Sequence, residues 1–89
     1  MLTIGIDIGS VTTKGVLMSD GALLSVKSCL TGYNAERAAR TIYGELLENE
    51  NLRETSVNVI VATGYGRNSV PFADKTLTEI MCHAVGAPI

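Results

Sequence analysis

Two apolar runs on either side of a short polar turn limit the fold of this chain most strongly. From Leu2 to Ile8, apolar residues alternate with small or polar ones, which is the period of a β-strand. A second apolar run begins with Gly15–Met18 after the turn, and the strand that contains it is expected over Thr13–Ser19. We therefore expect two strands joined by a tight turn, with Asp7 at the carboxyl end of the first strand.

The turn between these strands has the composition of a phosphate-binding loop. Its backbone N–H groups can point at an anion, glycine permits a close approach, hydroxyls can donate, and lysine supplies positive charge. The candidate phosphate-binding residues are Gly9, Ser10, Thr12, Thr13 and Lys14. Asp7 is the candidate catalytic residue and metal ligand, because a carboxylate there could hold hydrated Mg²⁺ or polarise a water. The same residue types also form ordinary hairpin turns, so the turn alone leaves both interpretations open.

Composition limits the classes of partner. The chain has 89 residues and a formal net charge of −2, and its basic residues are scattered, which argues against a nucleic-acid surface. Its apolar runs are all shorter than the ~18 residues that a membrane span needs, and its first residues have no basic flank typical of a signal peptide. We therefore expect a cytoplasmic protein. Cys29 and Cys82 are far apart and accompanied by one histidine, so we expect free thiols rather than a zinc site.

The remaining pattern predicts a single α/β domain over residues 1–89. A third strand is expected over Ala22–Leu30, then a helix capped by Asn34 that ends near Glu50. Val57–Thr63 is apolar on both faces and is expected to be a parallel strand, and a second helix is expected to begin near Thr76. The order β-β-β-α-β-α predicts a mixed sheet with strand order 3-2-1-4. The fourth strand would lie at an open edge, and its apolar sequence suggests that this edge is meant to be covered.

Further candidate residues lie outside the first turn. Gly64 and Arg67 belong to a loop at the carboxyl end of the fourth strand, where ligands sit in open α/β sheets. Glu79 lies four residues before His83 on the polar side of the second helix, but too few further ligands accompany them for a metal site. Gly64, Arg67 and Glu79 are therefore candidate contacts with a cleft or with a partner.

Three segments carry a resemblance to a known family. They are Gly5–Ser10 with Thr12–Lys14, Ala62–Arg67, and Thr78–Ile80 with Cys82–Ala84 and Gly86–Ala87. Together they resemble the ATP-dependent activators of 2-hydroxyacyl-CoA dehydratases, a family that includes benzoyl-CoA reductase ATPase subunits. These proteins belong to the actin, heat-shock chaperone and sugar-kinase superfamily, so the resemblance implies a ribonuclease-H-like half domain for this chain.

The resemblance also implies a function. Members fold as two such domains around a nucleotide cleft, hydrolyse ATP with Mg²⁺, and form homodimers that share one 4Fe-4S cluster. ATP turnover then drives an electron into a partner dehydratase or reductase. By position, Asp7 would lie near Mg²⁺ and the attacking water, the backbone of Gly9 to Thr12 would hold phosphates, and Lys14 would contact the β- or γ-phosphate.

The chain matches about the first third of such a protein. The second phosphate loop, the adenosine-binding residues and the cluster cysteines are absent, so we expect no iron–sulfur ligands here and a segment that is inactive alone. Two alternatives remain at this stage. One is the N-terminal piece of a sugar or acid kinase of the same superfamily, and the other is a non-catalytic scaffold subunit.

Overall fold

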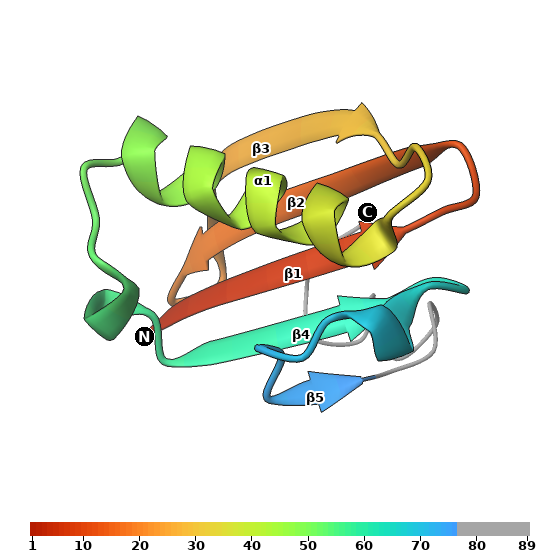
Figure 1. Cartoon of the computed structure of the whole chain (residues 1–89). Coiled ribbons are helices and arrows are strands. Elements are labelled where there is room, and N and C mark those ends of the chain that lie inside the picture. The colour runs from red at the N-terminus through yellow and green to blue at the C-terminus, as the bar shows by residue number, and fades with distance from the viewer. Residues whose placement is uncertain (77–89) are drawn as a thin grey trace.

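The computed structural model describes residues 1–76 and contains one mixed sheet (Figure 1). The sheet has the order β3-β2-β1-β4-β5, in which β2 runs antiparallel to both β1 and β3, and β4 runs parallel to both β1 and β5. The strands are β1 (Leu2–Ile8), β2 (Thr12–Ser19), β3 (Ala22–Leu30), β4 (Val59–Thr63) and β5 (Lys75–Thr76).

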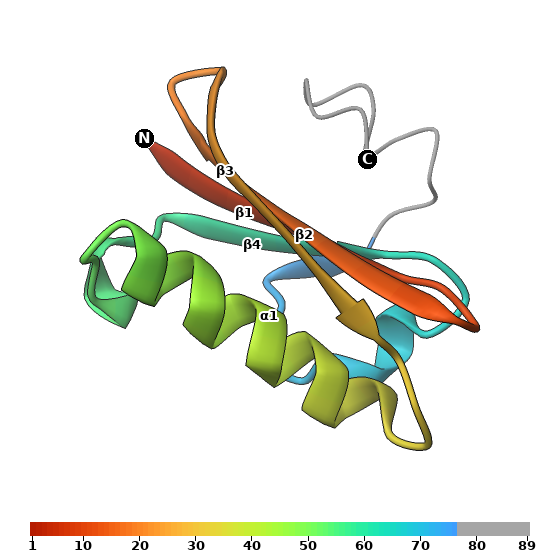
Figure 2. The same cartoon turned by 90° about the horizontal axis from the view of Figure 1, so that it is seen from above.

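Helix α1 (Ala35–Asn49) lies along one face of this sheet (Figure 2). Asn34 caps it as predicted, because its side-chain oxygen accepts a hydrogen bond from the backbone N–H of Arg37 at 3.0 Å. The predicted apolar stripe of the helix is buried against β1, β2 and β3. Its buried members are Ala38, Ala39, Ile42, Leu46 and Leu47.

The face of the sheet under α1 forms the main core. Ile4, Ile6 and Ile8 alternate along β1 and are completely buried there. A side chain on Gly15 of β2 would run into Ile42 of α1, so glycine lets the strand and helix approach closely at this point. Because the side chains of a strand alternate between faces, Asp7 lies on the opposite face from Ile6 and Ile8.

The boundaries of most elements agree with the sequence. The first and third strands have the predicted bounds, and the second begins one residue earlier, at Thr12. The fourth strand begins at Val59 instead of Val57, because Glu54–Ser56 forms a 3₁₀ helix whose last turn is closed by the Val57 N–H. A second 3₁₀ helix covers Arg67–Ser69.

The edge of the sheet differs from the prediction. The order 3-2-1-4 is confirmed, and β5, which the sequence did not predict, pairs with β4 and covers the edge that the apolar fourth strand was expected to need covered. The approach to β5 is fixed by Asp74, whose side chain accepts from the Ile60 N–H at 2.7 Å. Thr76, expected to begin a helix, is the last residue of β5, and the rest of that predicted helix lies outside the described residues. Within residues 1–76, no helix is long and apolar enough to cross a membrane.

Candidate phosphate-binding site

The predicted site residues meet where β1 ends beside β4. Asp7 pairs with Lys14 across the antiparallel β1–β2 ladder and with Thr63 across the parallel β1–β4 ladder. Directly paired residues project from the same face of a sheet, so these three side chains share the face opposite α1. Asp7 is half-buried, Lys14 is exposed, and Thr63 is fully buried. One carboxylate and one ammonium group therefore stand beside the turn that follows β1.

The turn between β1 and β2 presents backbone donors to solvent. It is closed by the Gly9 N–H, which donates to the carbonyl of Thr12 at 3.0 Å, and a Cβ atom at position 9 would lie 2.8 Å from that oxygen. Within the described part of the chain, the N–H groups of Ser10 and Val11 have no hydrogen-bond partner, and both residues are exposed. Two consecutive open N–H groups form the kind of concavity that binds anions.

Thr31, which follows β3, holds the turn in place by hydrogen bonds. Its hydroxyl donates to the Gly9 carbonyl at 2.8 Å, and its backbone N–H donates to the Val11 carbonyl at 2.8 Å. The Thr31 hydroxyl also lies 2.8 Å from the Thr13 hydroxyl. Because the single Thr31 hydroxyl proton is used on Gly9, the Thr13 hydroxyl must donate to Thr31. Thr13 is completely buried, so its hydroxyl takes part in this internal chain of hydrogen bonds.

The loop after β4 packs against the end of β1. Gly64 has a φ of +89°, and a Cβ atom there would lie 2.6 Å from a carboxylate oxygen of Asp7. The Gly66 N–H donates to the Ile8 carbonyl at 3.3 Å. Arg67 folds back on its own loop, where its guanidinium donates to the Gly64 carbonyl at 3.0 Å. The structure therefore brings Gly64 to Asp7 and places Arg67 behind the loop, whereas Glu79 lies outside the described residues.

Sequence reasoning missed two residues at this site. Thr31 directly follows the third strand, and no local pattern indicates its role because its contacts with the turn are made about twenty positions away in the sequence. Thr63 ends the apolar fourth strand, yet its buried hydroxyl lies on the same face as Asp7 and has no hydrogen-bond partner within residues 1–76. The sequence feature that could have indicated Thr63 is the Thr63–Gly64 pair at the carboxyl end of the strand.

The residues of the site fit a magnesium–phosphate complex. Mg²⁺ is usually held by one or two carboxylates together with water and substrate phosphates, and Asp7 supplies such a carboxylate beside the open N–H groups. Residues 1–76 hold no cluster of three or more His, Cys, Asp or Glu that could form an all-protein metal cage. A four-cysteine iron–sulfur site within one copy of this chain does not fit, because the whole sequence has two cysteines.

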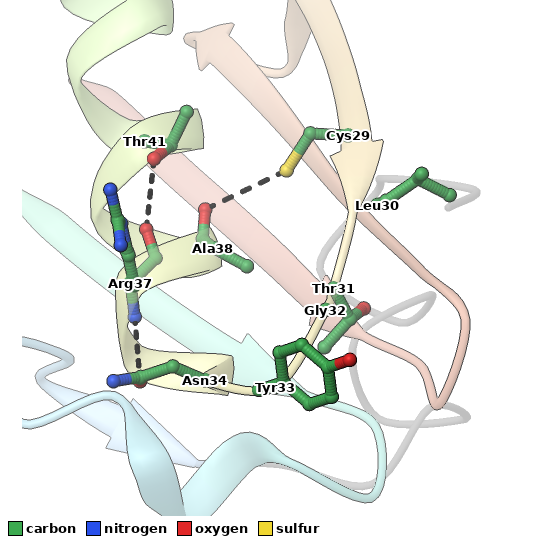
Figure 3. Close-up of a pocket in the computed structure, with 9 residues that line it drawn as sticks. All are labelled: Cys29, Leu30, Thr31, Gly32, Tyr33, Asn34, Arg37, Ala38 and Thr41. Atoms are coloured by element: carbon green, nitrogen blue, oxygen red, sulfur yellow. Dashed lines mark hydrogen bonds between the residues drawn. The ribbon is translucent and has the colours of Figure 1, made fainter.

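A separate pocket of about 330 Å³ lies between the end of β3 and the first turns of α1 (Figure 3). Cys29 lines it, and its thiol is 3.9 Å from the carbonyl of Ala38. Burial, reinforced by the nearby Glu45 carboxylate, raises the pKa of the Cys29 thiol. This free cysteine therefore stays protonated near neutral pH and lies on the α1 side of the sheet, away from the face that carries Asp7 and Lys14.

Comparison with known proteins identifies the family. The model of the BadF/BadG/BcrA/BcrD ATPase family matches residues 4–89. The chain belongs to this ATPase family. It is 41% identical over 87 residues to the (R)-2-hydroxyglutaryl-CoA dehydratase activating ATPase of Acidaminococcus fermentans, covering 96% of this chain and 33% of that protein. It is 36% identical to the activator of lactoyl-CoA dehydratase of Anaerotignum propionicum, covering 97% of this chain and 33% of that protein.

Solved structures of the family share the fold. The activator of the 2-hydroxyisocaproyl-CoA dehydratase from Clostridium difficile, with bound ADPNP, superposes with a TM-score of 0.84 at 32% identity. This match covers 94% of this chain and 31% of that activator. The chain thus spans about a third of the length of the relatives that it matches. The predicted family and the predicted half-domain fold are both confirmed.

Proposed function

We propose that this chain forms the first phosphate-binding side of an ATP-dependent activator of a 2-hydroxyacyl-CoA dehydratase. The observation that carries the proposal is the pair of open N–H groups at Ser10 and Val11, next to Asp7 and Lys14, in a member of an ATPase family. The bound ADPNP in the related activator supports ATP as the nucleotide. The identity to activators of three dehydratases supports this assignment over a sugar kinase.

Each group of the site has a role in this proposal. The N–H groups of Ser10 and Val11, with the exposed Ser10 hydroxyl and the half-buried Thr12, receive the terminal phosphates. Lys14 offsets phosphate charge, which a fixed ammonium group does well. Asp7 orients the hydration shell of Mg²⁺ or polarises the attacking water, and bound Mg²⁺ would supply charge neutralisation. Gly64 and Arg67 shape the loop beside Asp7.

Partners follow from the same relatives. The names of the similar proteins support a 2-hydroxyacyl-CoA dehydratase as the enzyme that is activated. By the resemblance, the cysteines of a 4Fe-4S cluster shared in a homodimer come from later segments of the family, and Cys29 and Cys82 do not match their positions, so we assign no cluster ligand to this chain.

The binding energy available to this side of the site is small. One charge-assisted contact such as Lys14 to phosphate contributes roughly 1.5–3 kcal/mol. Association costs on the order of 4–15 kcal/mol in lost freedom of movement. The 89-residue chain alone should therefore bind Mg·ATP no tighter than about millimolar and hydrolyse it negligibly.

NMR of the ¹⁵N-labelled chain, titrated with Mg·ATP, tests this proposal. We expect millimolar binding, with the largest amide shift changes at Ser10 and Val11 and smaller ones at Lys14. Mg²⁺ with adenosine is the control and should leave these amides unchanged. Amide shift changes confined to the Cys29 pocket, or calorimetry that gives micromolar affinity, would contradict the proposed site.

A further inference from the structure

One residue outside the phosphate turn holds two of its carbonyl groups. Thr31 donates through its hydroxyl to the Gly9 carbonyl and through its backbone N–H to the Val11 carbonyl, each at 2.8 Å. The residue is 5% exposed, so solvent does not compete strongly for the hydroxyl. These bonds join the loop after β3 to the turn after β1.

The bond to Gly9 has a specific consequence for Ser10. The Gly9 carbonyl and the Ser10 N–H belong to the same peptide unit, and in a planar trans peptide they point in opposite directions. With the carbonyl directed inward to Thr31, the N–H is directed away from Thr31, and it has no partner within the described residues. A flip of this peptide would instead present a carbonyl oxygen, which repels phosphate.

We propose that Thr31 is a positioning residue that holds the Gly9–Ser10 peptide with its N–H facing the phosphate. This inference rests on the function proposed above. The hydroxyl is the decisive group, because the backbone bond from Thr31 to Val11 remains in every variant at position 31. The Thr13 hydroxyl supports it by donating to the Thr31 oxygen, which commits the Thr31 proton to Gly9. Such chains of hydrogen bonds strengthen one another.

Three variants of the ¹⁵N-labelled chain, each titrated with Mg·ATP, test the proposal. Thr31→Val removes the hydroxyl but keeps the shape, and it should weaken binding roughly three- to tenfold, as expected for one lost hydrogen bond. It should also move the Ser10 amide resonance before any nucleotide is added. Thr31→Ser keeps the hydroxyl and should restore both the affinity and the Ser10 resonance.

Thr41→Val is the matched control. It removes a threonine hydroxyl that donates to the Arg37 carbonyl at 2.9 Å within α1, away from the turn, so affinity should stay native. If Thr31→Val does not fold, Thr31→Ala removes the same hydroxyl and has the same expected result.

The outcomes separate the two proposals. Native affinity in Thr31→Val with a normal response at Ser10 would overturn the role of Thr31 and leave the phosphate turn intact. Loss of affinity in Thr31→Ser equal to that in Thr31→Val would show that the hydroxyl is not the decisive group. No response at Ser10 and Val11 in the native chain would overturn both proposals.

Discussion

Gly64 packs directly against the carboxylate of Asp7. A Cβ atom at position 64 would lie 2.6 Å from Oδ1 of Asp7 and would also meet the backbone of Ile8, and the φ of Gly64 is +89°. Both the backbone conformation and the available space therefore require glycine here. The loop after β4 thereby limits where the candidate catalytic carboxylate can lie.

Gly64→Ala should lower the free energy of unfolding by roughly 2–5 kcal/mol. About 1–2 kcal/mol comes from the left-handed backbone conformation and about 1–3 kcal/mol from crowding against Asp7 and Ile8. Gly21→Ala is the matched control, because Gly21 has a φ of +84° but nothing within 4 Å of the added Cβ. Urea denaturation should show a smaller loss for Gly21→Ala, and equal losses would mean that the contact with Asp7 is easily relieved.

Lys14→Met should weaken Mg·ATP binding by at least about tenfold, through loss of a charge-assisted contact of roughly 1.5–3 kcal/mol. Because Lys14 is exposed, the unfolding free energy should change by less than about 0.5 kcal/mol. Lys27→Met removes a charge from β3 on the opposite face and serves as the control. The NMR titration measures both variants, and native-like binding by Lys14→Met would remove Lys14 from the site.

The elements that the sequence predicts well are those with a local period. Alternation predicts the bounds of the Leu2–Ile8 strand, the turn residues on either side predict those of Ala22–Leu30, and the apolar stripe after Asn34 predicts α1. β5 has only two residues, Lys75 and Thr76, and two residues show no period. Its pairing depends on contacts with β4 that the local sequence does not contain.

The sequence predicted which types of residue form the site, but not always to which face of the sheet each side chain points. Asp7 and Lys14 lie opposite one another because strand register follows from a short turn. Thr13 was grouped with the other hydroxyls of the turn, although alternation from Lys14 sends its side chain to the core. The hydrogen bond from Thr31 to Gly9 joins residues distant in the chain, so no local pattern predicts it.

The rate of alkylation of Cys29 should rise with pH, with its inflection moved to higher pH by the surroundings of the thiol. Burial and the Glu45 carboxylate raise the pKa of its thiol, so the folded chain should react slowly with iodoacetamide at neutral pH. In a Cys82→Ser variant, the inflection of rate against pH should lie higher for the folded chain than for the chain in urea. Glu45→Gln should lower that inflection only in part, since burial is the larger cause.

The raised pKa of the Cys29 thiol makes the stability of the folded chain depend on pH. The folded state favours the neutral Cys29 thiol. The contribution of this preference to the free energy of unfolding is fully present below the pKa of the unfolded thiol, and it is lost as pH rises through the pKa of the folded thiol. The unfolding free energy should therefore fall more steeply at alkaline pH in the Cys82→Ser chain than in a chain that also carries Cys29→Ala. Parallel curves for the two chains would contradict the raised pKa.

Thr13→Val and Thr31→Val should have strongly non-additive effects on Mg·ATP binding. The Thr13 hydroxyl donates to the Thr31 oxygen and the Thr31 hydroxyl donates to Gly9, so Thr13 acts on the turn only through Thr31. Once Thr31 has lost its hydroxyl, Thr13→Val should cost no further affinity, whereas in the native chain it should cost a few-fold. Titrations of the single and double variants complete the cycle, and a double variant whose loss equals the sum of the two single losses would mean that Thr13 affects the turn by a separate route.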